Sequence, residues 1–201
     1  AVNYDKQFGG NSQHRLTIDF QYEANAELEK SLIAQDGDAA ERVRTVENQD
    51  DILLQLDYTK PMGKVSNFEF GFRGNYEETD TDYTLEFNEN GQFILDENVS
   101  NNLIFRQYIN ALYTQFGSRI KDKFSYLIGL RMEQSRVTIN QITTNELKRK
   151  NYTGFFPTIN LGYTISEKQS ITLGYNRRIR RPRSRFINPF PSRSSATNIF
   201  Q

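Results

Sequence analysis

The chain has 201 residues, no cysteine, and 25 basic against 25 acidic residues, so its formal net charge is zero. The balanced charge argues against nucleic acid as a partner, and the missing cysteines exclude disulfides and thiolate metal sites. No apolar run approaches the roughly 18 to 20 residues of a membrane helix, but a membrane β-barrel stays possible because its strands alternate apolar and polar residues.

The first quarter of the chain predicts one strand between a turn and a long loop. Residues 5–13 contain two adjacent glycines and predict a short turn, and we expect His14, the only histidine, to be a turn residue as well. Apolar and polar residues alternate from Leu16 to Tyr22, which is the two-residue period of a strand. Residues 23–49 are polar without this period and predict a long loop, in which residues 26–33 could form one or two helical turns.

The middle of the chain predicts a hairpin, a second long loop and another strand. Residues 52–58 and 68–72 alternate on either side of a proline and glycine turn, and therefore predict the hairpin. Residues 77–102 are again long and polar, and a small hairpin turning at Glu89, Asn90 and Gly91 is expected to stand above the main sheet. Residues 103–116 predict a strand of open register, because both of its faces carry apolar residues.

The last part of the chain contains the clearest alternation. Residues 124–133 predict a strand, residues 137–150 predict a loop, and residues 156–176 predict a hairpin that turns at residues 166–169. One face of this hairpin is apolar and the other is polar. A basic tail follows, and its prolines cannot continue the ladder of backbone hydrogen bonds because proline lacks the amide donor.

Two regularities emerge from this order of elements. Short and long connections alternate along the chain, and the charged residues of the predicted strands lie opposite the apolar faces. Both features are typical of an outer-membrane barrel, which has short periplasmic turns, long outer loops and a polar interior. A soluble antiparallel sheet with one face on a core would alternate in the same way, but the longer predicted strands, of about 10 to 13 residues, are long for soluble sheets. We therefore predict an all-β fold, an antiparallel up-and-down transmembrane β-barrel.

The number of predicted strands indicates that this barrel is incomplete. Seven full strands are found, whereas bacterial single-chain barrels contain an even number and close on themselves. Ala1 also opens directly onto a polar stretch without a signal sequence, so either the protein is not exported or this is not its natural start. We expect residues 1–201 to be a fragment of one outer-membrane β-barrel domain, with about seven to eight strands of a larger barrel.

The basic tail carries the most specific pattern in the chain. The run from Arg178 to Pro182, followed by residues 187–190, resembles the RRI-x-RP…LNPF signature of the barrel of TonB-dependent receptors from Bacteroidetes. The segments LQLDYTKP, FEFGFRG, DYTLEF, GLRMEQ and FFPTINLGY fit the same family in the same order. Ile187 stands where the family usually has leucine, a change that conserves volume.

The resemblance implies a function for the whole receptor. Such a receptor would lie in the cell outer membrane and take up a small nutrient ligand, such as a siderophore, metal complex, glycan or peptide. Its partners would be outer-membrane lipid, its own plug domain and the TonB complex. The plug domain, the TonB box and the closing strands are missing from these residues, and nothing in them identifies the ligand.

The arginines of the tail are the candidate ligand-binding residues at the rim. Guanidinium groups match the geometry of phosphate and other anions, so this cluster could bind an anionic ligand or lipopolysaccharide phosphates. The structural alternative is that these arginines pair with acidic residues of the barrel lumen. The candidates are Arg178, Arg180, Arg181 and Arg183.

Other clusters favour structural roles over chemistry. The acidic run at Glu77, Glu78, Asp80 and Asp82 could bind calcium, but it lacks the glycine and spacing of a calcium loop and favours a solvated loop. We expect lumenal ion pairs from a group of acidic and basic residues on the predicted polar face: Glu69, Arg73, Arg131 and Glu133. No pattern predicts a catalytic, cofactor or metal site, so we expect no enzyme activity and no cofactor.

Three functions remain open from the sequence. The first is a barrel segment of a TonB-dependent receptor and transporter. The second is a soluble or cell-surface all-β binding module, and the third is an outer-membrane barrel enzyme that would use Glu69 or Glu133. An upstream plug domain would select the first of these, while a complete gene around these 201 residues would favour the second.

Overall fold

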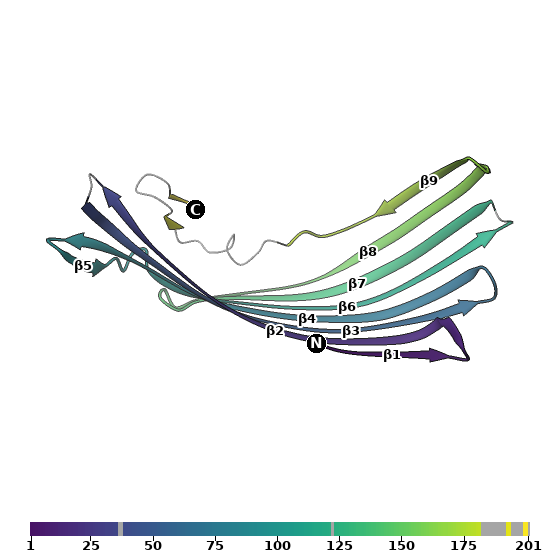
Figure 1. Ribbon diagram of the computed structural model, residues 1–201, viewed down its shortest axis with the longest axis horizontal. Helices are drawn as coiled ribbons and strands as arrows, with labels where there is room; N and C mark the ends of the chain where they lie inside the picture. The colour runs from purple at the N-terminus through teal and green to yellow at the C-terminus, as the bar shows by residue number, and fades with distance from the viewer. Residues whose placement is uncertain (36–37, 122, 182–191, 194–198, 201) are drawn as a thin grey trace.

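The structure is a computed structural model that describes all residues except 36–37, 122, 182–191, 194–198 and 201. The described residues form one large, curved and twisted antiparallel sheet (Figure 1). In the described part of the chain, no helix has the length and apolar character needed to cross a membrane. The strands of the sheet are β1 (Val2–Phe8), β2 (Asn11–Gln35), β3 (Asp38–Met62), β4 (Ser66–Glu89), β5 (Gln92–Leu95), β6 (Asn101–Ile120), β7 (Phe124–Gln141), β8 (Glu146–Ser166) and β9 (Gln169–Asn176).

The strands follow one another across the sheet in the order of the sequence. The order is β1-β2-β3-β4-β6-β7-β8-β9, and the short strand β5 pairs with the end of β4. The prediction of an antiparallel up-and-down sheet is therefore confirmed. Strand β1 adds one strand to the seven predicted, because Val2–Phe8 pairs with β2 instead of forming part of a turn. The sheet stays open between β1 and β9, and two further short strands, β10 (Ser192–Arg193) and β11 (Ile199–Phe200), pair only with each other.

The predicted long loops are wrong, because the strands continue through them. Residues 23–49 complete β2 and begin β3, with Glu27 opposite Glu47 in the ladder, and residues 26–33 are extended and not helical. Residues 137–150 likewise complete β7 and begin β8. Polar residues occupy both faces in these regions, so the two-residue period that marks a half-apolar strand is absent while the backbone ladder persists.

The small predicted hairpin is confirmed, but its predicted position is wrong. Asn90 and Gly91 have φ angles of 54° and 88°, the left-handed conformation that a tight two-residue hairpin turn requires at both positions. Strand β5 then pairs with β4, with Phe87 opposite Ile94. The hairpin therefore extends the main sheet and does not stand above it.

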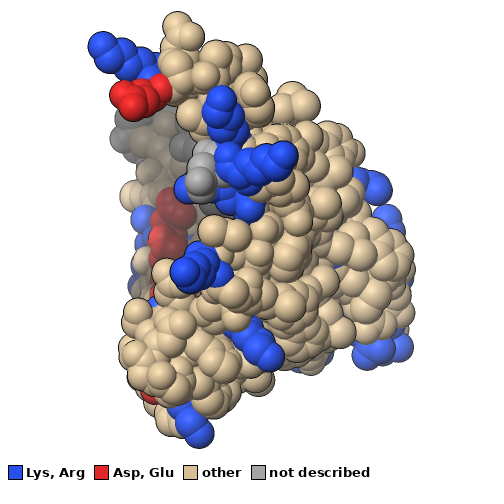
Figure 2. Space-filling view, turned by 90° about the vertical axis from the view of Figure 1, so that its right-hand side faces the viewer, with Lys and Arg blue, Asp and Glu red and all other residues tan. Residues whose placement is uncertain are grey.

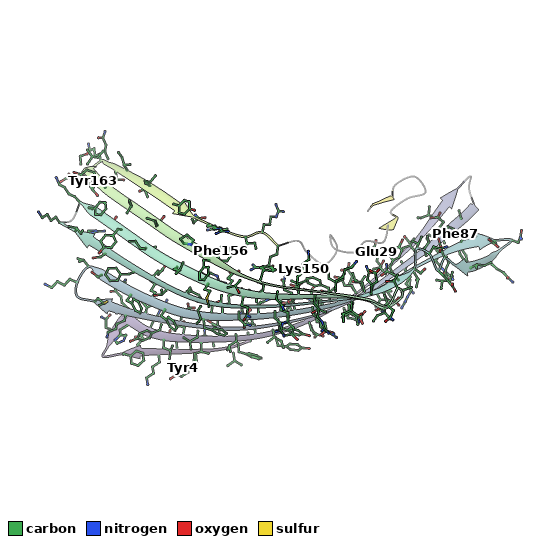
Figure 3. All side chains as sticks on the ribbon, turned by 180° about the vertical axis from the view of Figure 1, so that it is seen from behind. Tyr4, Glu29, Phe87, Lys150, Phe156 and Tyr163 are labelled. Atoms are coloured by element: carbon green, nitrogen blue, oxygen red, sulfur yellow. The ribbon has the colours of Figure 1, made fainter. Side chains whose placement is uncertain are left out.

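The short turns lie together at one end of the sheet, as the sequence predicts. They connect β1 to β2, β3 to β4, β6 to β7 and β8 to β9. Figure 3 marks the two ends of the sheet, with Tyr163 beside the short turns and Phe87 near the tips of the extended strands. We call these the turn end and the extended end.

The convex face of the sheet is apolar toward the turn end. Along β8 the convex side chains run from Phe155 to Tyr163, and along β7 they run from Phe124 to Met132. They are solvent-accessible in the sheet, with Phe155 53% and Leu130 47% exposed. Figure 2 shows the sheet from the turn end, with acidic side chains along its hollow left side and a mostly uncharged bulging side. We call this convex surface the apolar belt.

Above the apolar belt the sorting of side chains reverses. Along β4 the convex positions from Phe68 to Tyr76, toward the turn end, are apolar. The next convex positions, toward the extended end, carry Glu78, Asp80 and Asp82. The concave face changes in the opposite direction, and its apolar residues pack together near the extended end. This cluster comprises Ile33, Val43, Tyr83 and Leu85, with Phe87 and Val99 packed against it.

The open register of residues 103–116 is settled by pairing. Tyr108 lies opposite Tyr76, and Phe116 lies opposite Phe68, so both belong to the convex face. Ala111 and Tyr113 occupy the concave face of the same strand. His14 lies in β2 and not in the predicted turn, because its ring contacts Tyr58 across the β2–β3 ladder at 2.9 Å between Nε2 and the hydroxyl oxygen.

Candidate functional site

The concave wall of the sheet is held in place by a tyrosine that lies across a glycine. Gly71 and Tyr113 are opposite each other on β4 and β6, and any Cβ atom at Gly71 would overlap the Tyr113 ring. The tyrosine hydroxyl donates a hydrogen bond to Asp57 on β3. The missing side chain of Gly71 therefore lets one aromatic ring reach across the intervening strand and join β6 to β3.

An ion-pair network continues from this tyrosine toward the last strands. The Arg131 guanidinium lies 5.4 Å from the centre of the Tyr113 ring, within the range of a cation–π interaction. Arg131 Nε also donates a 2.6 Å hydrogen bond to Glu133. Glu133 also accepts a hydrogen bond from Arg181, which follows β9. The Glu133 side chain is only 9% exposed. The predicted lumenal pair of Arg131 and Glu133 is thus present.

Arg181 is the predicted rim residue that the structure connects to the wall. Its Nη2 donates to Glu133 and, at 3.0 Å, to the Ser135 hydroxyl, while its Nε donates to the Tyr152 hydroxyl at 3.2 Å. These contacts agree with the structural role predicted as the alternative to ligand binding, in which arginines of the tail pair with acidic residues of the barrel lumen. Arg181 therefore anchors the segment after β9 against β7 and β8.

The remaining rim candidates do not join this network. Arg178 and Arg180 are exposed, and no ion pair of either is found among the described residues. Arg183 lies outside the described residues. Among the rim arginines that the structure describes, only Arg181 therefore has a defined set of partners.

The other predicted ion pair on the concave wall takes a different form. Glu69 accepts a 2.5 Å hydrogen bond from the Gln115 amide, and Arg73 donates to Gln55 at 3.5 Å. Glu69 and Arg73 thus bind neutral amides and not each other. The carboxylates of this wall accept hydrogen bonds from amides, hydroxyls and guanidinium groups, which makes a hydrophilic and largely neutralised surface.

A polar groove lies on the concave wall at the turn end. It has a volume of about 380 Å³ and lies between the β3–β4 turn and strands β6 and β7. Its lining includes Glu69, Gln115, Lys64 and Arg119. The Ser66 and Ser118 hydroxyls are joined by a 2.7 Å hydrogen bond at the same place. The groove offers hydrogen-bond donors and acceptors to whatever fills the hollow of the sheet.

The acidic run predicted as a solvated loop lies on β4 in the extended region. Glu78 accepts a 2.9 Å hydrogen bond from Arg106, and Asp82 lies 3.6 Å from Arg44. The hydrogen bond from Arg106 lowers the pKa of Glu78, as Arg42 lowers that of Glu86. Within the described residues, no group of three or more acidic or histidine side chains is arranged to hold a metal ion.

Sequence reasoning missed the concave apolar cluster near the extended end. Tyr83, Leu85 and Phe87 alternate with Asp82, Thr84 and Glu86, which is a short two-residue period within the predicted loop of residues 77–102. Val43 on β3 lies directly opposite Leu85. Pairing this period with residues 41–45 would have revealed a longer hairpin with an apolar inner face.

Comparisons with known proteins agree with this architecture. The family model of the outer membrane protein β-barrel family matches residues 6–201. A crystal structure of the ferric citrate transporter FecA in its unliganded form overlays with a TM-score of 0.63 and 18% identity, over 85% of this chain and 25% of that one. The ferric yersiniabactin uptake receptor FyuA from Yersinia pestis overlays with a TM-score of 0.64 and 9% identity, over 81% of this chain and 25% of that one. No curated protein matches the sequence significantly.

The chain thus spans about a quarter of the length of each of these two structures. At these identities the overlays establish the fold, an open antiparallel sheet that corresponds to part of a larger barrel wall. The family match extends over nearly all of the residues. In such a barrel the apolar belt faces lipid and the concave wall faces the barrel interior. The chain therefore belongs to the outer membrane protein β-barrel family and lies in the outer membrane.

Proposed function

We propose that this chain is part of the barrel wall of a TonB-dependent receptor of the Bacteroidetes type, which imports a scarce nutrient across the outer membrane. The observation that carries the proposal is the hydrogen-bonded polar wall formed by Asp57, Tyr113, Arg131, Glu133 and Arg181 on the concave face. A wall of this kind suits a barrel with a folded domain or a hydrated ligand path inside it. The overlays with FecA and FyuA support the proposal at the level of fold.

In this proposal residues 1–201 are one segment of a barrel domain whose plug and closing strands belong to the rest of the receptor. The polar groove beside Glu69 and Gln115 contacts the plug at the periplasmic side. The apolar cluster around Leu85 lines the vestibule through which ligand enters. Arg178, Arg180 and Arg183 remain the proposed rim contacts for an anionic ligand, and Arg181 positions their segment.

The proposal assigns no catalytic role to this wall. Glu133 is held between two guanidinium groups, and Glu69 is hydrogen-bonded to an amide. In the described residues, neither carboxylate side chain is hydrogen-bonded to a hydroxyl or to a second carboxylate that would complete an acid–base pair. Substitution of Glu133 by glutamine should therefore change stability and not a hydrolytic rate.

Energised uptake tests the transport proposal directly. Strains lacking this gene, lacking TonB, or lacking both are compared for accumulation of a panel of labelled iron chelates, oligosaccharides and peptides. We expect at least one probe to be lost equally in all three strains, and its uptake to stop when a protonophore collapses the proton-motive force. Uptake that depends on the gene but continues unchanged without TonB would contradict the proposal.

A cross-linking experiment tests the plug contact. The segment contains no cysteine, so Asn67→Cys, in the polar groove, introduces a single thiol into it. In the full natural protein we expect this thiol to cross-link to the plug with a short bifunctional reagent. The matched control Asn110→Cys lies on the convex face of β6 and should give no such product.

A further inference from the structure

We propose that the convex surface above the apolar belt on β6, β7 and β8 is a binding site for a phosphorylated glycolipid of the outer leaflet. The site is built from Arg106, Arg136 and Arg149, one from each strand. It is separate from the concave wall and from the rim arginines, because all three side chains lie on the outer face of the sheet. It depends on the location in the outer membrane but not on transport.

The pairing of the strands places these arginines together. Arg106 and Arg149 both lie opposite Thr138, from the two sides of β7, and Arg136 lies two residues before Thr138 on that strand. Residues two apart on a strand share a face, and diagonal neighbours on adjacent strands lie about 7 to 8 Å apart. One headgroup that carries two anionic groups can therefore reach more than one of these guanidinium groups.

Their height on the sheet matches the headgroup region. Tyr108, the last aromatic residue of the convex face of β6, lies opposite Arg136, and Arg106 is the next convex residue of β6 beyond it. Tyr108 also packs on Tyr76 of β4, with ring centres 4.7 Å apart. Aromatic side chains of this kind mark the membrane–water interface, so positions directly beyond them lie among phosphates and sugars.

The charge of this surface is of one sign. The convex positions of β6, β7 and β8 beyond Tyr108, as far as the structure describes them, carry these three arginines and no acidic residue. The neighbouring strand β4 borders the site with the acidic convex residues Glu78, Asp80 and Asp82, and Glu78 partly neutralises Arg106 at 2.9 Å. Arg136 and Arg149 are exposed, and no ion pair of either is found among the described residues.

The surrounding residues suit a sugar headgroup. Several convex neighbours of the arginines on β7 and β8 are uncharged and carry amide or hydroxyl groups that can bind sugar hydroxyls. Guanidinium groups bind phosphate oxygens through two parallel hydrogen bonds, which gives a phosphate-specific contact. These polar neighbours are Thr138, Asn140, Asn151 and Thr153, and the apolar side chains of Ile104 and Leu147 lie next to Arg106 and Arg149 on the same face.

Binding of lipid A to the full natural protein in detergent tests this site. Affinity is measured for bisphosphorylated lipid A and for the same lipid after enzymatic removal of both phosphates, at low and high salt. We expect the phosphorylated form to bind more tightly and its affinity to fall with salt. We expect Arg136→Gln/Arg149→Gln to weaken its binding about tenfold, because two charge-assisted contacts are lost.

The matched control removes the same charge from the other face. Lys148 and Lys150 flank Arg149 on β8 but lie on the concave side, so Lys148→Gln/Lys150→Gln should bind like the wild type. The variant Arg136→Lys/Arg149→Lys keeps the charge but loses the paired hydrogen bonds, so its affinity should lie between those of the wild type and the double glutamine variant. Equal binding of the phosphorylated and dephosphorylated lipids, or wild-type affinity of a folded Arg136→Gln/Arg149→Gln protein, would overturn the proposal.

Folding is checked by the shift in electrophoretic mobility on heating. If the double glutamine variant does not fold, Arg149→Gln alone replaces it, with Lys150→Gln as its control. Arg149 is exposed near the β7–β8 turn, so its loss leaves the ladder intact. Equal lipid A affinity of these two single variants would also count against the site.

Discussion

The ring of Tyr113 occupies the space that a side chain at Gly71 would need, on the concave face of two paired strands. Because the ring lies flat across the neighbouring strand, its hydroxyl reaches Asp57 on the strand beyond. A residue without a Cβ atom is therefore required at position 71 for a contact that joins three strands.

Gly71→Ala should destabilise the barrel by about 1 to 3 kcal/mol, because the added methyl group displaces the Tyr113 ring and breaks its hydrogen bond to Asp57. Gly117→Ala is the matched control, since the nearest atom to its added Cβ lies at an ordinary 3.6 Å. The measurement is urea unfolding of the full natural protein in lipid vesicles. Equal stability of the two alanine variants would show that the ring has no fixed position.

Arg181→Ala should release the segment after β9 from the wall. Glu133 would keep Arg131 as a partner but lose a second charged hydrogen bond, at a cost of about 1.5 to 3 kcal/mol. Hydrogen exchange of peptides covering residues 169–181 and 146–154 should become faster. Arg178→Ala, at an exposed position, is the control and should leave both peptides unchanged.

The ion pair of Glu78 and Arg106 should weaken in acid. The folded-state pKa of Glu78 is lowered, chiefly by the hydrogen bond from Arg106, so its stabilisation is complete above the unfolded pKa of about 4.3 and is lost as the pH falls through the lower folded value. The stability difference between the wild type and Glu78→Gln should therefore shrink below about pH 4.3. It should stay within about 1 kcal/mol, as for other solvent-accessible pairs.

A double-mutant cycle isolates this pH effect from other carboxylates. In an Arg106→Gln background, the effect of the further change Glu78→Gln on the free energy of unfolding should no longer show this dependence on pH. The same unfolding measurements at pH 6 and pH 3.5 provide the comparison. An unchanged pH dependence in that background would assign the effect to another partner of Glu78, such as Tyr76.

Ile128→Arg should destabilise the inserted protein by about 2 to 4 kcal/mol, because it places a charge on the lipid face near the middle of the apolar belt. Asn160→Arg adds the same side chain to the concave face of the neighbouring strand, where water reaches it, and should have a small effect. Refolding yield into vesicles and unfolding in urea measure both variants. Similar losses for both would mean that the two faces do not meet different solvents.

The sequence predicts the parts of this fold where the two faces of a strand differ in polarity. Residues 124–133 and 156–176 were placed correctly because lipid on one side and water on the other impose a clear two-residue period. The same period fails around Glu27 and Glu47, where water reaches both faces and only the backbone ladder preserves the strand. A polar loop and a polar hairpin have the same composition in this region. The local sequence pattern therefore cannot distinguish a long loop from strands that continue beyond the membrane.

The candidate site was predictable in its residue types more than in its pairings. Arg131 and Glu133 were expected as lumenal partners from their shared face. The contact of Arg181 with Glu133 joins residues far apart in sequence, and the crossing of Tyr113 over Gly71 depends on strand register that was open. Both required knowing which positions lie opposite each other across the sheet.

The reversal of polarity at Tyr76 restricts how such a strand can change in length. One uninterrupted ladder runs through the reversal, from Ser66 to Phe87 against β3, without a bulge. Inserting or deleting a single residue within it would turn every following side chain to the opposite face, so that charges meet acyl chains or oily groups meet water. Length variation among related barrels should therefore occur in steps of two residues, or be confined to the hairpin tips.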